Sequence, residues 1–224
     1  MPNIISNNTN SGYLYSYQLP KSTYTWAQWV GYTGPSDTAY VNPANMTTQV
    51  DGTQPTFWVG NRAYVVFDTT SIGPSTSVSN FTLNLYKYTT FAPAQFICRK
   101  ATLPNMSTAL TVAHWPTTNF TGVYSSAATT LTPPGWISIP LNSLAVTDAQ
   151  TSNTMTIGLQ NFTYDYSGAI PTGIQQYTPF YLATPGFFPY LSYTGRPTVN
   201  GVTAANQEKI DGVVQTSIQR INGV

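Results

Sequence analysis

Two runs of aromatic residues carry the side chains best suited to binding chemistry in this sequence. The first run lies within residues 24–32 and the second within residues 177–190. Tyr and Trp offer a flat apolar face and a polar edge, a combination that suits stacking against sugar rings. The alternative is that these rings form a core or a contact between subunits. The candidates for glycan contact are Trp26, Trp29, Tyr32, Tyr177, Tyr181 and Phe187.

The titratable side chains do not form a pattern typical of catalysis. His114 is the only histidine, and a general base or metal ligand there would need partners that the neighbouring sequence lacks. We expect it to pack on Trp115 at the end of a strand. A glycosidase needs two carboxylates about 5–9 Å apart, whereas the acidic residues here are scattered. We therefore predict that the chain is not an enzyme, with no catalytic residue, no metal and no cofactor.

Two aspartates near expected turns have structural interpretations. Asp68 ends a predicted strand and is expected to order the turn that follows, or to pair with Arg62. Asp165 lies in a stretch of aromatic and polar residues and is expected to cap a turn. The alternative for Asp165 is a role as a Ca²⁺ ligand, because this ion prefers carboxylate and carbonyl oxygens.

The composition implies a surface with almost no charge. Charged residues make up 7% of the 224 residues and the net charge is +1, against about 25% charged residues in an average domain. Nucleic-acid binding relies on clustered cations, and the only adjacent pair is Arg99 and Lys100, so we exclude that class of partner. Such a surface suits a fixed assembly or contact with a neutral polymer.

Membrane insertion and signal-directed secretion are also not expected. The apolar runs are far shorter than the ~20 residues of a membrane span, and the first residues lack the basic and apolar regions of a signal peptide. Cys98 is the single cysteine, so no intrachain disulfide is possible. We expect Cys98 to behave as a small hydrophobic residue in a strand.

Strands are the elements that must position the aromatic rings. Segments rich in β-branched and aromatic residues lie between Pro- and Gly-containing turns, as in all-β domains. In the segment 62–68 we expect Ala63, Val65 and Phe67 to face the core, with Arg62 and Tyr64 facing outward. Strands are predicted at residues 38–42, 62–68, 78–90, 95–100, 110–115, 136–141, 155–162, 177–183 and 189–194. This pattern predicts an all-β fold, an antiparallel two-sheet β-sandwich of the jelly-roll type, over residues 21–195.

Alternation is clean in two further segments. In the segment 78–90 the residues expected to face the core are Phe81, Leu83 and Leu85, and those expected to face outward are Thr82, Asn84 and Tyr86. In the segment 155–162 the core-facing residues are Met155, Ile157 and Leu159, and the outward-facing ones are Thr156 and Gln160.

Both ends of the chain are predicted to lie outside the sandwich. Residues 1–20 are expected to form a Tyr-rich arm, and residues 196–224 a tail in which three Asn/Asp-Gly turns recur every eleven residues, at Gly201, Gly212 and Gly223. The segments 203–209 and 214–220 are candidates for short helices. A unit this small cannot bury its own apolar face, so we expect it to assemble with copies of itself or dock on a partner. The alternative is a disordered C-terminus. The tail residues expected to mediate assembly are Val199, Val202, Ile210, Val213, Ile218 and Ile221.

Part of the sequence resembles the DNRLRE-type β-sandwich domains. The matching block is an Arg-led strand over residues 62–68 that ends in Phe-Asp, a short turn that contains Ile72, and a strand over residues 78–86 that ends in Leu-Tyr. Weaker likeness covers residues 38–194. Where that family has a small residue this chain has Phe81, which implies a repacked core. The resemblance implies a fold similar to carbohydrate-binding modules and a place in surface or polysaccharide-handling proteins, although a fold alone does not fix a ligand.

The leading hypothesis is a virion surface structural protein, such as a phage head fibre, a capsid decoration protein or a tail-spike component, assembled in the host cytoplasm. The tail repeat is similar to C-terminal repeats of bacteriophage structural proteins. The expected partners are further copies of the chain in a homo-oligomer, for example a trimer, other virion proteins, and a host surface polysaccharide. The alternative is a non-catalytic carbohydrate-binding module of a cell-surface protein.

Overall fold

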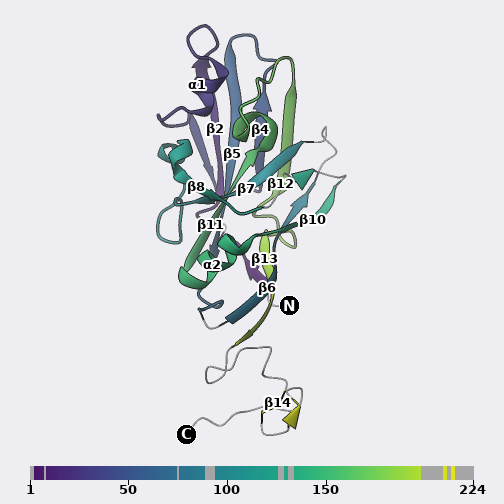
Figure 1. Cartoon of the computed structure of the whole chain (residues 1–224). Coiled ribbons are helices and arrows are strands. Elements are labelled where there is room, and N and C mark those ends of the chain that lie inside the picture. Colours follow the sequence, from purple (N-terminus) through teal and green to yellow (C-terminus); the bar gives the residue numbers. More distant parts are fainter. Residues whose placement is uncertain are drawn as a thin grey trace.

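The structure is a computed structural model that describes residues 3–7, 9–74, 76–88, 94–125, 129–130, 134–197, 209–210 and 213–214. Figure 1 shows the chain as an elongated β structure with short helices at its surface. The strands are β1 (Asn3–Ile5), β2 (Gly12–Pro20), β3 (Thr38–Val41), β4 (Asn45–Asp51), β5 (Phe57–Asp68), β6 (Thr76–Lys87), β7 (Gln95–Ala101), β8 (Phe120–Val123), β9 (Thr129–Thr130), β10 (Gly135–Pro140), β11 (Thr154–Asn161), β12 (Gln175–Tyr181), β13 (Tyr190–Pro197), β14 (Lys209–Ile210) and β15 (Val213–Val214). The helical elements are α1 (Trp26–Val30), η1 (Val112–His114), η2 (Thr117–Asn119), α2 (Ser143–Thr151) and the π-helical turn η3 (Phe162–Tyr166).

The strands form two antiparallel layers around one core. In the first layer β5 is central, with β2 and then β3 on one edge and β11, β7 and β8 on the other. In the second layer β6 lies between β10 and β13, and β1 pairs with β13. Strands β4 and β12 connect the two layers at one end. The predicted all-β, sandwich-like fold is confirmed.

The core between the layers is built by residues that alternate along each strand. Phe81, Leu83 and Leu85 of β6 are buried there against Met155, Ile157 and Leu159 of β11, as predicted. Helix α2 closes one flank with two buried alanines. It begins after Asn142, whose side chain accepts the backbone N–H of Ala145 and so satisfies one of the free donors of its first turn. Sequence reasoning did not predict this helix.

The other face of β5 is also buried, which corrects the prediction that Arg62 and Tyr64 face outward. Both residues are fully buried under a second hydrophobic cluster that contains Trp26 and Trp29 of α1 and Trp115. Thr156 and Gln160 on the neighbouring β11 are buried too. Strand β5 therefore has one face on each of two hydrophobic clusters, and period-two alternation alone cannot distinguish such a strand from a half-exposed one.

Two glycines in the first layer provide the space for rings of the second cluster. A Cβ at Gly60 of β5 would overlap the indole ring of Trp29, and a Cβ at Gly158 of β11 would overlap the ring of Phe120. These rings therefore lie directly on the backbone of the sheet, a close approach that only glycine allows.

Residues 110–115 do not form the predicted strand. They include the 3₁₀ turn η1, in which the Nδ1 atom of His114 accepts the backbone N–H of Thr111 at 3.1 Å. Leu110 and Trp115 pack into the second cluster. The local hydrogen bond and the burial of both ends favour a turn over an extended strand.

The N-terminal segment is integral to the first layer. Residues of β2 pair with β5 from Gly12 opposite Tyr64 to Pro20 opposite Phe57, and Tyr13 stacks on Tyr40 of β3 with ring centroids 4.6 Å apart. Strand β1 pairs with β13 in the second layer. The sandwich thus includes the residues from Asn3 onward that were expected to form an arm.

In the tail the structure describes one short pair of strands. Strand β14 pairs with β15 in antiparallel register, with Ile210 opposite Val213. Lys209 and Val214, at the ends of the two segments expected to be helices, are in these strands. The expected assembly residues Val199, Val202, Ile218 and Ile221 lie outside the described residues. Within the described part of the chain, no helix has the length and apolar character of a membrane span.

Candidate functional site

The first aromatic run does not form a surface for ligand stacking. Trp26 and Trp29 are 1% and 0% exposed, and their rings stack on each other with centroids 4.4 Å apart. The indole N–H of Trp26 donates to the backbone carbonyl of Tyr164 at 3.1 Å. Helix α1, which begins after the Thr25 capping box, directs both tryptophans onto β5. The predicted role of these two residues in glycan contact is wrong, because their rings cover the sheet.

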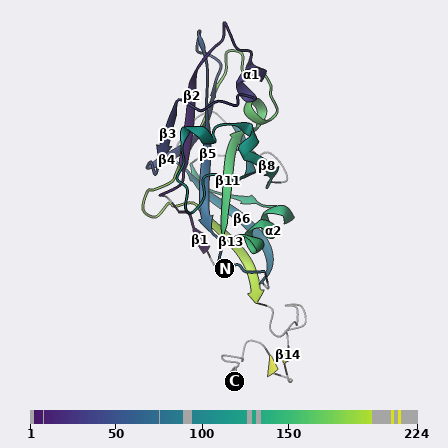
Figure 2. The same cartoon turned by 90° about the vertical axis from the view of Figure 1, so that its left-hand side faces the viewer.

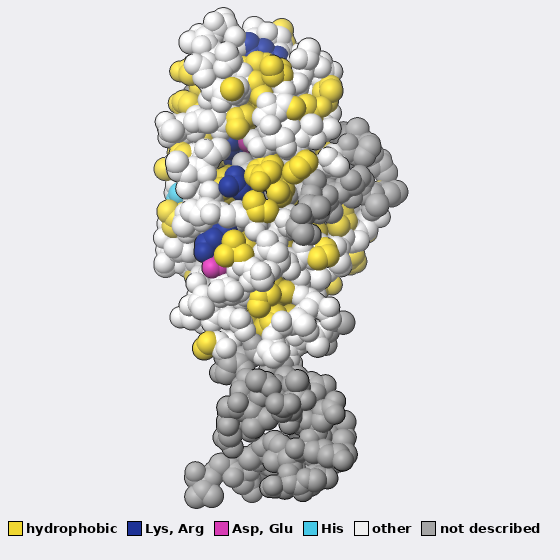
Figure 3. Space-filling model, in the orientation of Figure 1, with side chains coloured by type: hydrophobic (Ala, Val, Ile, Leu, Met, Phe, Trp, Pro, Cys, Tyr) yellow, Lys and Arg dark blue, Asp and Glu magenta, His cyan; other side chains and the backbone are white. Residues whose placement is uncertain are grey.

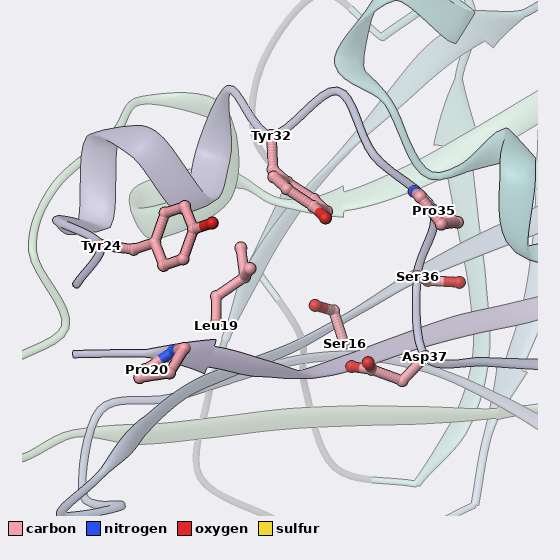
Figure 4. Close-up of a pocket in the computed structure, with 8 residues that line it drawn as sticks. All are labelled: Ser16, Leu19, Pro20, Tyr24, Tyr32, Pro35, Ser36 and Asp37. Atoms are coloured by element: carbon pink, nitrogen blue, oxygen red, sulfur yellow. The ribbon is translucent and has the colours of Figure 1, made fainter. Parts of the chain in front are cut away.

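Tyr32 lies elsewhere, at the edge of this region. It is half-buried, and its ring meets that of Tyr24 edge to face, with centroids 6.3 Å apart. Both rings line a surface pocket beside β2, which Figure 4 shows in close-up.

The second aromatic run contributes to a cluster on the surface of the second layer. The half-buried rings of Tyr181 and Phe187 lie 5.1 Å apart, and both contact Tyr86 of β6, with centroid distances of 5.7 and 4.4 Å. Trp136 of β10 packs edge to face on Tyr86 at 5.4 Å. The two predicted residues are therefore brought together, but with partners from β6 and β10 that the sequence did not place beside them.

Tyr177 continues the row of rings toward the first layer. Tyr88 stacks on Tyr181 at 4.7 Å, and its side chain also bonds with Tyr177. Burial, followed by the neighbouring Tyr40 and Tyr177, raises the pKa of Tyr13 to about 12. Burial also raises the pKa of Tyr88, so the Tyr13 and Tyr88 phenols stay uncharged at neutral pH.

Trp136 is the most exposed ring of the cluster and was not a predicted site residue. It is 44% exposed, and the rings of Tyr86 and Tyr190 hold it at 5.4 and 5.2 Å. A signal for it was present in the sequence, because Trp136 precedes Ile137, Ser138 and Ile139 in an alternating strand and so takes an outward position. The strand predicted over residues 136–141 is confirmed as β10, but its first residue is not among the predicted site residues.

Beside Trp136 the outer face of the second layer carries a polar groove of about 490 Å³. Strand register forms it: Ser138 of β10 lies opposite Asn84 of β6, and Asn84 lies opposite Tyr190 of β13. In the next row Thr82 lies opposite Ser192. Backbone pairing in three strands thus places these side chains on one face.

The groove is organised around the amide of Asn84, which is only 4% exposed. The Asn84 oxygen accepts from the Ser138 hydroxyl at 2.6 Å, and the Asn84 nitrogen donates to the Ser192 oxygen at 2.9 Å. The Thr82 and Ser192 hydroxyls share a further hydrogen bond of 2.6 Å. The network fixes the orientation of every member. We name the groove together with the Trp136 ring the outer-face groove.

The outer-face groove continues into a smaller apolar hollow of about 220 Å³. Asn3 and Tyr190 line both, and Ile5, Trp136 and Phe188 line the hollow. None of the residues that line either space carries a formal charge. Figure 3 shows the same character more widely, with charged side chains isolated among uncharged ones on the visible face.

The titratable residues have structural partners. Arg62 forms a buried ion pair with Asp165, whose two oxygens accept from its Nε and Nη2 atoms at 2.9 and 2.6 Å. This replaces both the turn-capping and the Ca²⁺ interpretation of Asp165, and also the pairing of Arg62 with Asp68. The Asp68 carboxylate accepts the backbone N–H and the hydroxyl of Thr70, so its predicted role in the turn is confirmed. Cys98 is buried in a strand as expected.

The described residues hold no group of three or more His, Cys, Asp or Glu side chains close enough to bind a metal ion. Compared with protein-family models and with curated proteins, the chain matches none.

Proposed function

We propose that this chain is a non-catalytic attachment protein of a virion surface, and that the outer-face groove binds a neutral polysaccharide. The observation that carries the proposal is the exposed Trp136 ring beside a groove of fixed, uncharged hydrogen-bonding groups. An aromatic platform next to hydroxyl and amide groups matches the two faces of a sugar residue, one apolar and one rich in hydroxyls.

The lack of charge favours a neutral ligand. An acidic polysaccharide would leave its carboxylates or sulfates without cationic partners in a groove lined only by uncharged residues, and burying an unpaired charge is costly. Neutral sugar hydroxyls, by contrast, find both donors and acceptors there. The Ser138 hydroxyl donates to Asn84, which leaves the lone pairs of its oxygen to accept a hydrogen bond from a ligand.

The groove is also pre-organised. Its side chains project from paired strands and hold one another through hydrogen bonds, and Trp136 is held by two rings. Binding therefore requires little further ordering of side chains, which otherwise opposes association. A shallow groove still gives weak affinity per site, so several copies in one assembly would supply avidity.

The proposed place on a virion is supported by composition and by the tail repeat. A chain with 7% charged residues suits a fixed assembly, and two of the expected assembly residues, Ile210 and Val213, are register partners in the pair of strands β14 and β15. A carbohydrate-binding module of a cell-surface protein would use the same groove. Light scattering on the full chain and on a chain that ends at Pro197, the last residue of β13, tests the assembly role: loss of a defined oligomer on truncation supports it, and two equal monomers contradict it.

The groove is tested by calorimetric titration of the full chain against a panel of neutral polysaccharides. We expect at least one to bind, Trp136→Ala to weaken that binding roughly tenfold, equivalent to about 1.4 kcal/mol, and Ser138→Ala to weaken it less. Tyr17→Ala is the matched control, because Tyr17 is 43% exposed, close to the 44% of Trp136, and lies on β2. Binding to none of the panel, or equal binding by the Trp136→Ala variant, would overturn the proposal.

A further inference from the structure

A second hollow with different chemistry lies beside β2 and α1. Figures 1 and 2 place α1 at the end of the elongated sandwich remote from β6 and β13, so this pocket is separate from the outer-face groove. Its volume is about 400 Å³, which is large enough for one sugar residue. Figure 4 shows Tyr24, Tyr32 and Leu19 around one part of it and Ser16 and Asp37 around another.

The aromatic part of the pocket is held in place. The rings of Tyr24 and Tyr32 meet edge to face at 6.3 Å. The backbone carbonyl of Tyr24 accepts the indole N–H of Trp58 at 2.7 Å. Tyr32 lies over Gly34, where an added Cβ would overlap the phenol ring. The two rings therefore present fixed faces and edges to the space between them.

The polar part is equally well defined. The backbone N–H of Asp37 donates to the Tyr15 carbonyl at 3.0 Å, and the Asp37 carboxylate accepts the backbone N–H of Tyr17. The pairing of β2 with β5 shifts register between Ser16 and Leu19, an irregularity of the kind that redirects side chains. As a result both Ser16 and Leu19 line the pocket.

Ser16 directs a hydroxyl toward the pocket. It is only 2% exposed, yet its hydroxyl has no hydrogen-bond partner among the described residues. Figure 4 shows this hydroxyl pointing into the pocket. A hydroxyl that faces an open pocket can donate to and accept from a ligand or water.

The pocket is acidic, unlike the outer-face groove. Asp37 is the one charged residue among those that line it. The nearest basic residue in the sequence, Lys21, is directed elsewhere: its ammonium donates to the Gly52 and Gln54 carbonyls and lies 4.5 Å from the centroid of the Trp58 ring. A carboxylate beside two aromatic rings attracts a cation through charge and through cation–π contact.

We propose that this pocket binds the protonated amine of an amino sugar. The Asp37 carboxylate would accept from the ammonium group, and the Tyr24 and Tyr32 rings would contact its positive charge and the apolar face of the sugar. The Ser16 hydroxyl would bond with a sugar hydroxyl. This hydroxyl partner favours an amino sugar over choline, which carries the same charge on methyl groups. The proposal does not rest on the outer-face groove.

The test is titration of the full chain with glucosamine, N-acetylglucosamine and choline, with binding measured by NMR and by calorimetry. We expect millimolar binding of glucosamine that weakens with salt, and at least tenfold weaker binding of N-acetylglucosamine, which keeps the ring but lacks the charge. Equal binding of the two sugars, or no binding of either, would overturn the proposal. Choline that binds as well as glucosamine would overturn the assignment to a sugar.

Variants locate the site. Asp37→Asn keeps the shape of the side chain and removes its charge, so it should reduce glucosamine binding at least tenfold. Gly34→Ala should weaken binding by displacing Tyr32. Asp68→Asn, which removes a carboxylate from an exposed turn, should leave glucosamine binding unchanged, and near-UV circular dichroism checks that each variant is folded. Full binding by Asp37→Asn would overturn the proposal.

Discussion

The two hydrophobic clusters on either side of β5 differ in the types of residue that form them. Between the layers, the cluster consists of aliphatic and aromatic side chains in regular alternation, such as Val65, Leu83 and Ile157. On the opposite face of β5, the cluster combines three tryptophans with the buried cation of Arg62. The first cluster joins sheet to sheet, whereas the second joins loops and a short helix to a sheet. Irregular segments expose backbone carbonyls, and a charged side chain can satisfy several of them at once.

Arg62 does this for three separate segments. Its guanidinium donates to the carbonyls of Trp115 and Val30 at 2.5 and 3.1 Å as well as to the Asp165 carboxylate. The Trp115 ring lies 4.2 Å from its Cζ atom. Strand pairing therefore positions the segments around the first cluster. Around the second cluster, the buried ion pair of Arg62 and Asp165 positions them instead.

The largest effect is expected from breaking this ion pair. Arg62→Met leaves Asp165 buried without its cation, so we expect it to lower the free energy of unfolding by about 3–5 kcal/mol, measured by urea denaturation. Lys100→Met is the control, because the ion pair of Lys100 with Asp148 is partly exposed and such pairs contribute about 0–1 kcal/mol. Similar losses in both variants would remove the distinction between the two pairs.

In the cluster between the layers, the largest loss of stability should come from a substitution that leaves a cavity. Leu159→Ala removes a fully buried side chain from the core between the layers, and we expect a loss of about 2–5 kcal/mol in unfolding free energy. Tryptophan fluorescence should change little, because the three clustered tryptophans lie on the other side of the sheet. A large spectral change in the folded variant would mean that the two clusters are coupled.

A smaller effect is expected at the entrance to α1. Thr25→Ala removes the side chain that accepts the backbone N–H of Gln28 in the capping box, and such changes lower stability by about 1 kcal/mol. Because α1 carries Trp26 and Trp29, hydrogen exchange should increase in the second cluster before it increases between the layers. An increase of equal size in both clusters would contradict their separate organisation.

The smallest expected effect is a pH dependence of the unfolding free energy that arises from His114, beside the second cluster. Burial holds the pKa of His114 below its ordinary 6.5, so the unfolded chain takes up the proton first. The resulting stability is present above pH 6.5 and decreases as the pH falls through 6.5 toward the lower folded pKa. Protonation of Nδ1 would also remove the hydrogen bond from Thr111.

Urea midpoints between about pH 7.5 and about pH 5.5, where histidine is the ordinary titrating side chain, measure this dependence. The decrease should be absent in His114→Gln. A midpoint that stays constant over this range in the unmodified chain would contradict the prediction.

The parts of the fold that the sequence predicts well are those with one buried face. Strand β6 alternates between core residues and Thr82, Asn84 and Tyr86 on the outer face, and its pattern is read correctly. The prediction for the outer face of β5 is wrong because segments distant in sequence bury that face. The local sequence pattern carries no information about such segments. The strand predicted over residues 110–115 is wrong for a related reason, because the hydrogen bond from the Thr111 N–H to the His114 side chain favours a turn.

The candidate site was predicted only in part. Tyr181 and Phe187 do lie in a surface cluster, and Tyr32 lines a pocket. Trp26 and Trp29 are core residues because a five-residue helix directs both toward the sheet. The network around Asn84 depends on the register of three strands, and register is not visible in a single strand. Aromatic content therefore predicts that rings gather at the surface, but not which rings do so.

The glycines under Trp29 and Phe120 have a consequence for tracing the ancestry of this chain. The same two rings lie near Arg62, with centroids 5.7 and 5.9 Å from its Cζ atom. A larger residue at Gly60 or Gly158 would displace a ring and with it the environment of the cation. Among related sequences, we therefore expect Gly60, Arg62 and Gly158 to be either all retained or all substituted. A three-position signature of this kind would identify distant relatives after loops, surface charges and ligand-binding rings have all been replaced.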